Sequence, residues 1–440
     1  MNYKSLVYNV FFLFALCILD ISCTDETEQI QSTLGTRTRS AEGIGSVSGM
    51  TATTYTHSVL FQAQLTGWDE ETHKLRTYGF CFSTMEEVPS YKFNTETNTK
   101  RVSTRNIDAD GLFSYEFNNV ELEQTYWVRA WVILQDRITD NIDTLFSEVT
   151  SFKIDLTVPS IETMPVVNRS KMGAVVFARF KDAGNIPLSK WGICLSERPN
   201  PTPDDIVEYA RDTCKFAAYH GEFGAFFQEL TPSRLYHTRA FVITEDGKTV
   251  YSEDRIFRTT RGGDYAWSWA SNREGAVSDG AAERIEIAMD SAAYYYNNYS
   301  NLYLRARVEY NTGVPTADCS FGGWIRFGAN SRYQWVGTAQ HETAHGLGVG
   351  TTSDWGTHLS SGVWIHPIAQ RTLRAVMHDQ SQEIHGDTQH FWPGGINQRE
   401  EVTNGTTNSY GESIRNERML RANAMILNAM RLDGLWGPGR

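Results

Sequence analysis

Two histidines and a glutamate stand at the spacing of a metal-binding helix in the segment 341–345 (HETAH). Residues four apart on an α-helix lie one turn above each other, so both imidazoles can reach one ion at about 2.0–2.1 Å. Glu342 lies beside that ion, where a carboxylate can act as base toward metal-bound water. The segment therefore predicts a Zn²⁺ site with His341 and His345 as ligands and Glu342 as the catalytic residue. The alternative is an amphipathic helix whose histidines are ordinary hydrogen-bonded residues.

A catalytic zinc ion needs a third protein ligand and an open fourth position. Gly348 extends the pattern to HExxHxxG, as in the metzincin peptidases, whose third histidine would fall at Thr351. Threonine is not a usual zinc ligand, so the third ligand is expected farther along the chain. The candidates there are His358, His366, His378, Glu383, His385, Asp387 and His390.

Three segments of the C-terminal part carry a resemblance to a known family: 310–317 (YNTGVPTA), 341–355 (HETAHGLGVGTTSDW) and 386–397 (GDTQHFWPGGIN). Together they resemble an uncharacterised zincin-type metallopeptidase family of secreted bacterial and fungal proteins. The resemblance covers about residues 265–435 and implies that the histidine before Phe-Trp-Pro, His390, is the third ligand.

Two residues near His390 are alternative third ligands, Asp387 and His385. Asp387 could equally be a carboxylate that orients an imidazole from behind. Gly394 stands where the family usually has tyrosine, so the resemblance does not extend to the details of the substrate pocket.

The expected reaction is hydrolysis of peptide bonds in an extracellular protein or glycoprotein. Zinc makes its bound water more acidic and polarises a carbonyl, and Glu342 would carry the proton from that water to the leaving amine. An oxyanion donor is also needed, and Tyr410, His358 and His385 are available.

The elements around the motif leave two questions open. The strand expected at 323–328, just before the zinc helix, is either an edge that pairs with an extended peptide or a core strand. Trp355, Trp364 and Trp392 are expected to pack rather than to form a platform for sugars.

Two other functions compete with the peptidase. The chain could be a surface adhesin, or a lipoprotein binding glycan or protein, whose zincin-like domain is not catalytic. It could also be a zinc hydrolase of a non-peptide amide. The intact Glu342 argues against the first alternative, because a site without catalysis has no need of that carboxylate.

Upstream of the zinc motif the chain repeats itself. The matching pairs are 78–83 (YGFCFS) with 191–196 (WGICLS), 126–132 (YWVRAWV) with 236–242 (YHTRAFV), and 147–148 (SE) with 252–253 (SE). Three matches in the same order, each about 110 residues apart, indicate two copies of one domain.

Each copy is expected to be a β-sandwich. Segments such as 58–65 and 174–180 alternate in period two, which is typical of half-buried strands. The stretch 230–240 (LTPSRLYHTRA) resembles fibronectin type III domains of bacterial surface proteins. The resemblance implies spacing or binding without chemistry, and a corner hydrogen bond from Tyr236.

The fold class is therefore multidomain, with two all-β fibronectin III/Ig-like sandwiches followed by an α+β zincin-like metalloprotease domain. The three domains are expected at 43–155, 158–260 and 264–440. The elements expected in the last one are helix 283–299, strand 302–310, strand 323–328, the zinc helix at about 334–346, an irregular segment and helix 411–432.

The N-terminus has the features of an export signal. Residues 1–23 carry Lys4, a short apolar stretch and then Cys23, which resembles a bacterial lipoprotein signal, and the acidic run after it resembles the surface-export signal of Bacteroidetes lipoproteins. The expected location is the outer membrane at the cell surface, anchored through lipidated Cys23, with a flexible tether at 24–42. The alternative is an ordinary secretory signal and a secreted protein.

Charge and cysteine content exclude other classes. The net charge of −12 and the absence of any cluster of Lys and Arg argue against nucleic acid as a partner. No CxxC pair occurs, so a structural zinc cluster is excluded. Cys81 and Cys194 are expected as buried strand residues, and a bridge from Cys194 to Cys214 is possible but not favoured.

Overall fold

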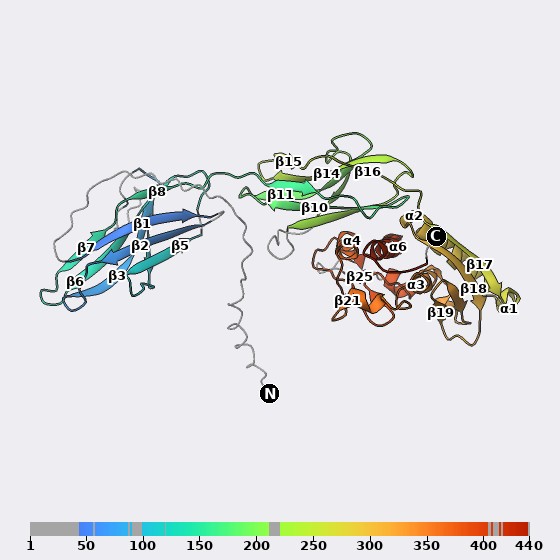
Figure 1. Ribbon diagram of the computed structural model, residues 1–440. Helices are drawn as coiled ribbons and strands as arrows, with labels where there is room; N and C mark the ends of the chain where they lie inside the picture. Colours follow the sequence, from blue (N-terminus) through green and yellow to red (C-terminus); the bar gives the residue numbers. More distant parts are fainter. Residues whose placement is uncertain are drawn as a thin grey trace, which may run out of the picture. The chain divides into compact units, whose positions relative to one another are not determined.

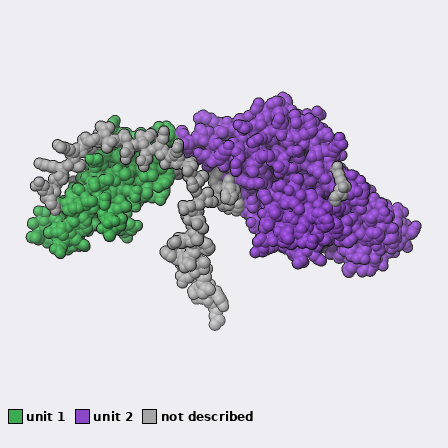
Figure 2. All heavy atoms as spheres, in the orientation of Figure 1, with its two compact units in different colours: residues 1–155 green, residues 156–440 purple. Residues whose placement is uncertain are grey.

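The computed structural model describes residues 44–438 except 56–57, 87–88, 90–98, 119, 211–220, 404–405, 408–412 and 415–416. The expected signal, tether and lipidated cysteine, together with Cys214 and Tyr410, lie outside the described residues. The chain divides into two compact units, Met1–Asp155 and Leu156–Arg440 (Figure 2). Across the described part of the chain, no helix is long and apolar enough to cross a membrane.

Both repeat copies fold as two antiparallel sheets around an apolar core, so the β-sandwich expectation is confirmed (Figure 1). In the first copy the sheets are β1 (Ser46–Thr54), β2 (Val59–Thr66) and β5 (Leu112–Phe117), and β4 (Lys100–Thr104), β3 (His73–Ser83), β6 (Tyr126–Asp136) and β7 (Ile142–Phe146), with β8 (Thr150–Phe152) also on β6. In the second they are β9 (Ser160–Thr163), β10 (Ala174–Asp182) and β13 (Glu222–Phe227), and β12 (Ile206–Tyr209), β11 (Leu188–Ser196), β14 (Leu235–Thr244) and β15 (Thr249–Tyr251), with β16 (Arg255–Arg258) also on β14. The strand order is the same in both.

The repeated tyrosine makes the expected corner hydrogen bond in each copy. The hydroxyl of Tyr236 accepts from the backbone N–H of Thr231 at 3.0 Å, and that of Tyr126 accepts from the N–H of Glu121 at 3.1 Å. Both rings are buried, so each hydroxyl satisfies an N–H at the sandwich corner while its ring fills the core.

The repeated cysteines are buried strand residues, as expected. Cys81 and Cys194 are free thiols with no exposed surface, and each thiol donates to a proline carbonyl, of Pro89 at 3.4 Å and of Pro201 at 3.2 Å. Burial raises the pKa of each thiol to about 11, so neither is a nucleophile at neutral pH.

After the second sandwich a mixed sheet begins. Its order is β17 (Asp264–Ser271), β18 (Tyr303–Tyr310), β20 (Trp324–Phe327) and β19 (Ala317–Ser320). The first three strands are parallel, and β19 runs antiparallel to β20 at the edge. The strand expected at 323–328 thus has neighbours on both sides and is a core strand, because the short segment before it turns back to form the edge.

Helix α2 (Ala282–Tyr299) connects the parallel strands β17 and β18 and packs on β17. The apolar face expected at helical spacing, which includes Ile285, Met289 and Tyr299, is buried. A short helix α1 (Arg273–Ser278) precedes α2. The periodicity of apolar residues therefore located α2 correctly.

The rest of the chain contains the following elements: η1 (Ser331–Tyr333), α3 (Val336–Gly346), η2 (Trp355–His358), β21 (Leu359–Ser360), β22 (Val363–Trp364), α4 (Pro367–Met377), β23 (His385–Gly386), β24 (Phe391–Trp392), α5 (Arg399–Thr403), β25 (Thr406–Thr407), β26 (Ser413–Ile414) and α6 (Glu417–Leu432). The segment expected to be irregular thus contains a helix, α4, and a four-stranded sheet, β21–β24. The signal for α4 was present in the sequence, since Pro367 opens the helix and Ala369, Leu373 and Val376 recur at helical spacing.

The second sandwich shares its core with the helices that follow it. Val175, Phe177 and Phe226 belong to the same apolar cluster as α4 and α6, and α4 packs on β13 and β10. Arg371 of α4 makes two hydrogen bonds to the carboxylate of Glu222, at 2.7 and 3.0 Å. This sandwich is therefore packed into the C-terminal part of its unit, and is not an independent spacer.

A buried amide network crosses the same contact. The Asn168 side chain donates to Thr372 Oγ1 at 2.8 Å and to the Met425 carbonyl at 3.1 Å, and accepts from Asn428 Nδ2 at 2.7 Å. Asn168 and Asn428 are both buried, so water cannot replace these hydrogen bonds if one of the side chains is removed.

Asn168→Ala is expected to lower the free energy of unfolding of this unit by about 1–3 kcal/mol, because it removes the acceptor of the buried Asn428 amide and two further hydrogen bonds. Urea denaturation followed by tryptophan fluorescence measures the change. Asn106→Ala, at an exposed position of the first unit, is the matched control. A cost below about 1 kcal/mol would contradict a stabilising role for the network.

Candidate metal centre

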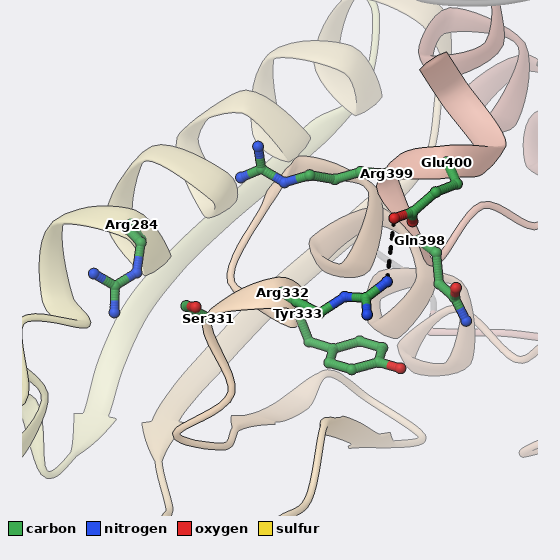
Figure 3. A pocket seen from close by; sticks show the side chains of 7 residues that line it. All are labelled: Arg284, Ser331, Arg332, Tyr333, Gln398, Arg399 and Glu400. Atoms are coloured by element: carbon green, nitrogen blue, oxygen red, sulfur yellow. Dashed lines mark hydrogen bonds and ion pairs between the residues drawn. The ribbon is translucent and has the colours of Figure 1, made fainter. Parts of the chain in front are cut away.

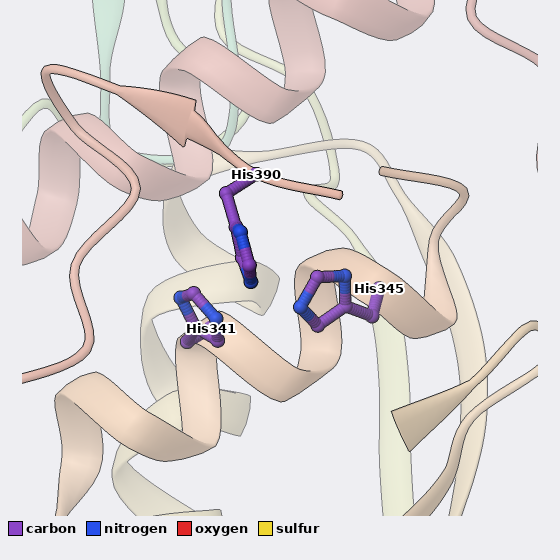
Figure 4. Close-up of side chains that lie close together, drawn as sticks. All are labelled: His341, His345 and His390. Atoms are coloured by element: carbon purple, nitrogen blue, oxygen red, sulfur yellow. The ribbon is translucent and has the colours of Figure 1, made fainter. Parts of the chain in front are cut away.

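Three imidazoles meet in the C-terminal part of the chain, those of His341, His345 and His390 (Figure 4). One ring nitrogen of each lies within 4.8 Å of the other two, and the ring centroids are 4.9, 5.3 and 5.3 Å apart. His341 and His345 project from α3, and His390 approaches from the hairpin of β23 and β24. Among the described residues, this is the one group of three such side chains with the spacing of a metal site.

Helix α3 ends directly after the second histidine. Its last residue is Gly346, and Gly348 and Gly350 follow with φ of 121° and 64°, values that disfavour other residues. Thr351 Oγ1 donates to the carbonyl of His345 at 2.5 Å. The position that holds a third histidine in metzincins thus caps the helix end here.

Close packing of Gly350 places the third histidine over the helix. A Cβ on Gly350 would lie 2.2 Å from the carbonyl oxygen of Gln389 and 2.3 Å from its Cα. Trp355 Nε1 holds the same hairpin by donating to the carbonyl of Asp387 at 2.8 Å. The glycine therefore allows the chain before His390 to lie directly against the turn after α3.

Gly350→Ala is expected to weaken zinc binding by at least tenfold, because the added methyl group must push Gln389, and with it His390, away from α3. Zinc competition with a fluorescent chelator measures the change. Gly247→Ala, at a glycine with positive φ and open space around its Cβ position, is the control for backbone strain alone. Equal zinc affinity in the two variants would contradict this role of Gly350.

Each imidazole has a second partner that orients it. His345 Nδ1 donates to the carbonyl of Val349 at 2.8 Å, and the backbone of Ile396 lies close enough to His341 to act on its pKa. His390 Nδ1 lies 3.4 Å from Asp387 Oδ2. With Nδ1 of His345 bonded to a carbonyl, its Nε2 keeps the lone pair that a metal ion needs.

Asp387 lies behind the third histidine and orients it. Its Oδ1 accepts from the backbone N–H of Gln389 at 2.7 Å and of His390 at 2.6 Å. These bonds lower the pKa of Asp387 against the opposing effect of its burial, and keep it ionised. Asp387 therefore contacts His390 and lies outside the group of three imidazoles.

The electrostatics of the cluster fit a cation. Burial, with smaller effects of His345 and His390, lowers the pKa of His341 to about 3, and burial also lowers the pKa of His345. These imidazoles are therefore neutral at neutral pH, which is the form that binds zinc. Three imidazole nitrogens within 4.8 Å of one another are a donor set that suits a zinc ion.

Glu342 lies between the two helical histidines in sequence and is 3% exposed. Burial, and then the charge of Asp318, raises the pKa of Glu342 to about 8 in the absence of a metal ion. Asp318 and Cys319 belong to β19, and burial, followed by the nearby charge of Glu342, raises the pKa of the Cys319 thiol. Sequence reasoning missed both, because only the pairing of β19 with β20 brings them to α3.

The structure places the remaining third-ligand candidates elsewhere. His358 Nδ1 lies 2.8 Å from His366 Nε2, and His358 Nε2 lies 3.3 Å from Asp354, in a cluster of their own. His378 lies between Glu208 and Arg418 at the contact with the second sandwich. Glu383 and His385 lie outside the three-histidine group.

The tryptophans near the site divide into two kinds. Trp355 and Trp364 are buried and pack together, as expected, with ring centroids 5.7 Å apart. Trp392 is 48% exposed and stacks on His385 at 6.2 Å. The packing expectation therefore holds for two of the three.

Comparisons with known proteins do not assign a family. No protein-family model matches the chain, and no curated protein matches it. Among solved structures, one described as the fourth FNIII domain of a human protein is similar at 18% identity and a TM-score of 0.18, over 25% of this chain and 85% of that one. The sandwich fold accordingly rests on the strand pairing within this chain.

Proposed function

We propose that the chain is a zinc-dependent metallopeptidase with a zincin-like C-terminal domain, whose ligands are His341, His345 and His390. The observation that carries the proposal is the convergence of these three imidazoles beside the buried carboxylate of Glu342. The sequence order on α3 adds support, because a carboxylate between two ligands at this spacing is the arrangement of zinc peptidases.

Glu342 acts as general base and acid in this proposal. A bound zinc ion would polarise the scissile carbonyl and make water more acidic. Glu342 takes a proton from the attacking water and delivers it to the nitrogen of the leaving amine. Its position between the two ligand histidines on α3 supports this role, since it lies beside the metal site where it can reach the attacking water.

The free edge of β19 is the proposed binding site for an extended substrate. Gly328 N, just beyond β20, donates to the Thr316 carbonyl, so in the register of this pair positions 316, 318 and 320 bond inward. In an antiparallel pair the alternate positions, Ala317 and Cys319, direct their backbone groups to the open side. That edge lies against α3, so a peptide added there passes the zinc helix.

The proposed substrates are extracellular because the protein itself is expected to be exported. We propose that Cys23 is lipidated, that the protein stands on the outer membrane at the cell surface, and that its substrates are extracellular proteins or glycoproteins. The signal residues in the sequence support this location.

Metal-dependent proteolysis tests the proposal. Purified full-length protein is expected to contain about one zinc ion per chain, to cleave at least one member of a proteome-derived peptide mixture, and to lose cleavage on chelation. Restoring zinc should restore cleavage. Bound zinc without cleavage of any peptide would refute the peptidase, and cleavage of a non-peptide amide instead would assign the alternative hydrolase.

A further inference from the structure

A pocket of about 330 Å³ opens near the start of the zinc helix (Figure 3). It is lined by Arg284, Ser331, Arg332, Tyr333, Gln398, Arg399 and Glu400. Arg284 comes from α2, the middle group from η1 just before α3, and the last group from the segment after the metal-binding hairpin. Three separate parts of the chain therefore build it.

The pocket is positively charged. It holds three arginines and one carboxylate, in a protein whose net charge is −12. Arg284 is held in place by Nε, which donates to Gln334 Oε1 at 2.8 Å. Arg332 contacts Glu400 at 3.1 Å, with side chains 69% and 55% exposed, so this ion pair is weak and an incoming anion can compete for it.

The pocket is linked to the metal centre by a short stretch of chain. The Asn397 carbonyl, next to Gln398 of the pocket, accepts from Trp335 Nε1 at 2.8 Å and from Thr338 Oγ1 at 2.9 Å. Thr338 lies on α3 about one helical turn before His341, so these bonds tie the pocket wall to the helix of the metal centre.

We propose that this pocket binds a carboxylate of the peptide substrate, a few residues from the bond that is cleaved. The inference rests on the proposed peptidase function and names its substrate class. Guanidinium groups bind carboxylates with paired N–H···O bonds, and Arg284 and Arg332 line the pocket from two different elements, α2 and η1. The carboxylate belongs either to an acidic side chain or to a free C-terminus.

Peptide binding tests this pocket without depending on cleavage. The probes are fluorescein-labelled ten-residue peptides, each with glutamate or glutamine at one position, made with either a free or an amidated C-terminus. Zinc-loaded full-length protein carrying Glu342→Gln keeps the peptides intact, and fluorescence anisotropy measures Kd. The expected result is about tenfold tighter binding of the carboxylate-bearing peptide.

The arms of the experiment identify the source of the carboxylate. An advantage of glutamate over glutamine at one or two adjacent positions assigns an acidic side chain. An advantage of acid over amide assigns the C-terminus. In either case Arg284→Gln with Arg332→Gln should reduce the advantage to less than about twofold, whereas Arg307→Gln, at an exposed arginine of β18, should leave it unchanged.

Two results would overturn the proposal. One is equal binding of all matched peptides, including no binding of any. The other is a carboxylate advantage that persists in the double arginine variant. Carboxylate-dependent binding together with absence of cleavage by the wild-type protein would support the pocket and refute the peptidase function, so the two failures are distinguishable.

Discussion

Glu342→Gln is expected to lower kcat for peptide cleavage by about 10²–10⁴-fold while the zinc content stays unchanged. Glutamine has nearly the shape of glutamate but cannot accept and return a proton. The site is closed around this side chain, which is 3% exposed, so bulk water cannot easily replace its carboxylate. Steady-state cleavage kinetics and metal analysis on the same preparations measure the two quantities.

A matched control uses the carboxylate next to this site. Asp318 forms a two-bond ion pair with Arg326, and its charge raises the pKa of Glu342. Asp318→Asn keeps Glu342 and its burial, the larger cause of its raised pKa, so it should change the rate far less than Glu342→Gln. Equal activity of Glu342→Gln and wild type would contradict a catalytic role for Glu342. Zinc binding without activity in the wild type would instead favour the adhesin hypothesis.

His390→Ala is expected to weaken zinc binding by more than about a hundredfold. Removing a partner that only orients a ligand already costs 10–100-fold, and His390 supplies one of the three nitrogen donors. Competition with a fluorescent zinc chelator gives the affinity. Circular dichroism checks that the variant keeps its fold.

Two neighbours of His390 provide graded controls. Asp387→Asn removes the carboxylate behind the imidazole and should weaken zinc binding by about tenfold. His385→Ala removes a histidine that stacks on Trp392 outside the cluster, and should leave the affinity unchanged. If His385→Ala lost zinc and His390→Ala kept it, the assignment of the third ligand would be wrong.

Because the second sandwich packs against α4, these experiments need the full chain and not the C-terminal part alone. Because the apolar cluster extends from Phe226 through α4 to α6, removing the sandwich would expose part of the core. The full chain is therefore the appropriate material for metal and activity measurements.

Local patterns in the sequence were enough to predict individual helices and the position of two imidazoles. The period of Ile285, Met289 and Tyr299 located α2, and the HETAH spacing placed two imidazoles on one helical face. Each of these depends on residues close together in the chain, whose relative positions follow from backbone geometry alone. His390 came from a resemblance between motifs, not from geometry.

Only the tertiary structure decided the rest. It brought His390 to α3 through the close packing at Gly350, placed Asp387 next to His390 and outside the group of three imidazoles, and made β19 the edge strand where β20 had been a candidate. Contacts between residues far apart in the chain depend on how strands pair and helices pack. Strand pairing and helix packing depend on the whole chain and not on the spacing of neighbouring residues. The spacing within HETAH therefore does not reveal which distant histidine lies beside His341 and His345.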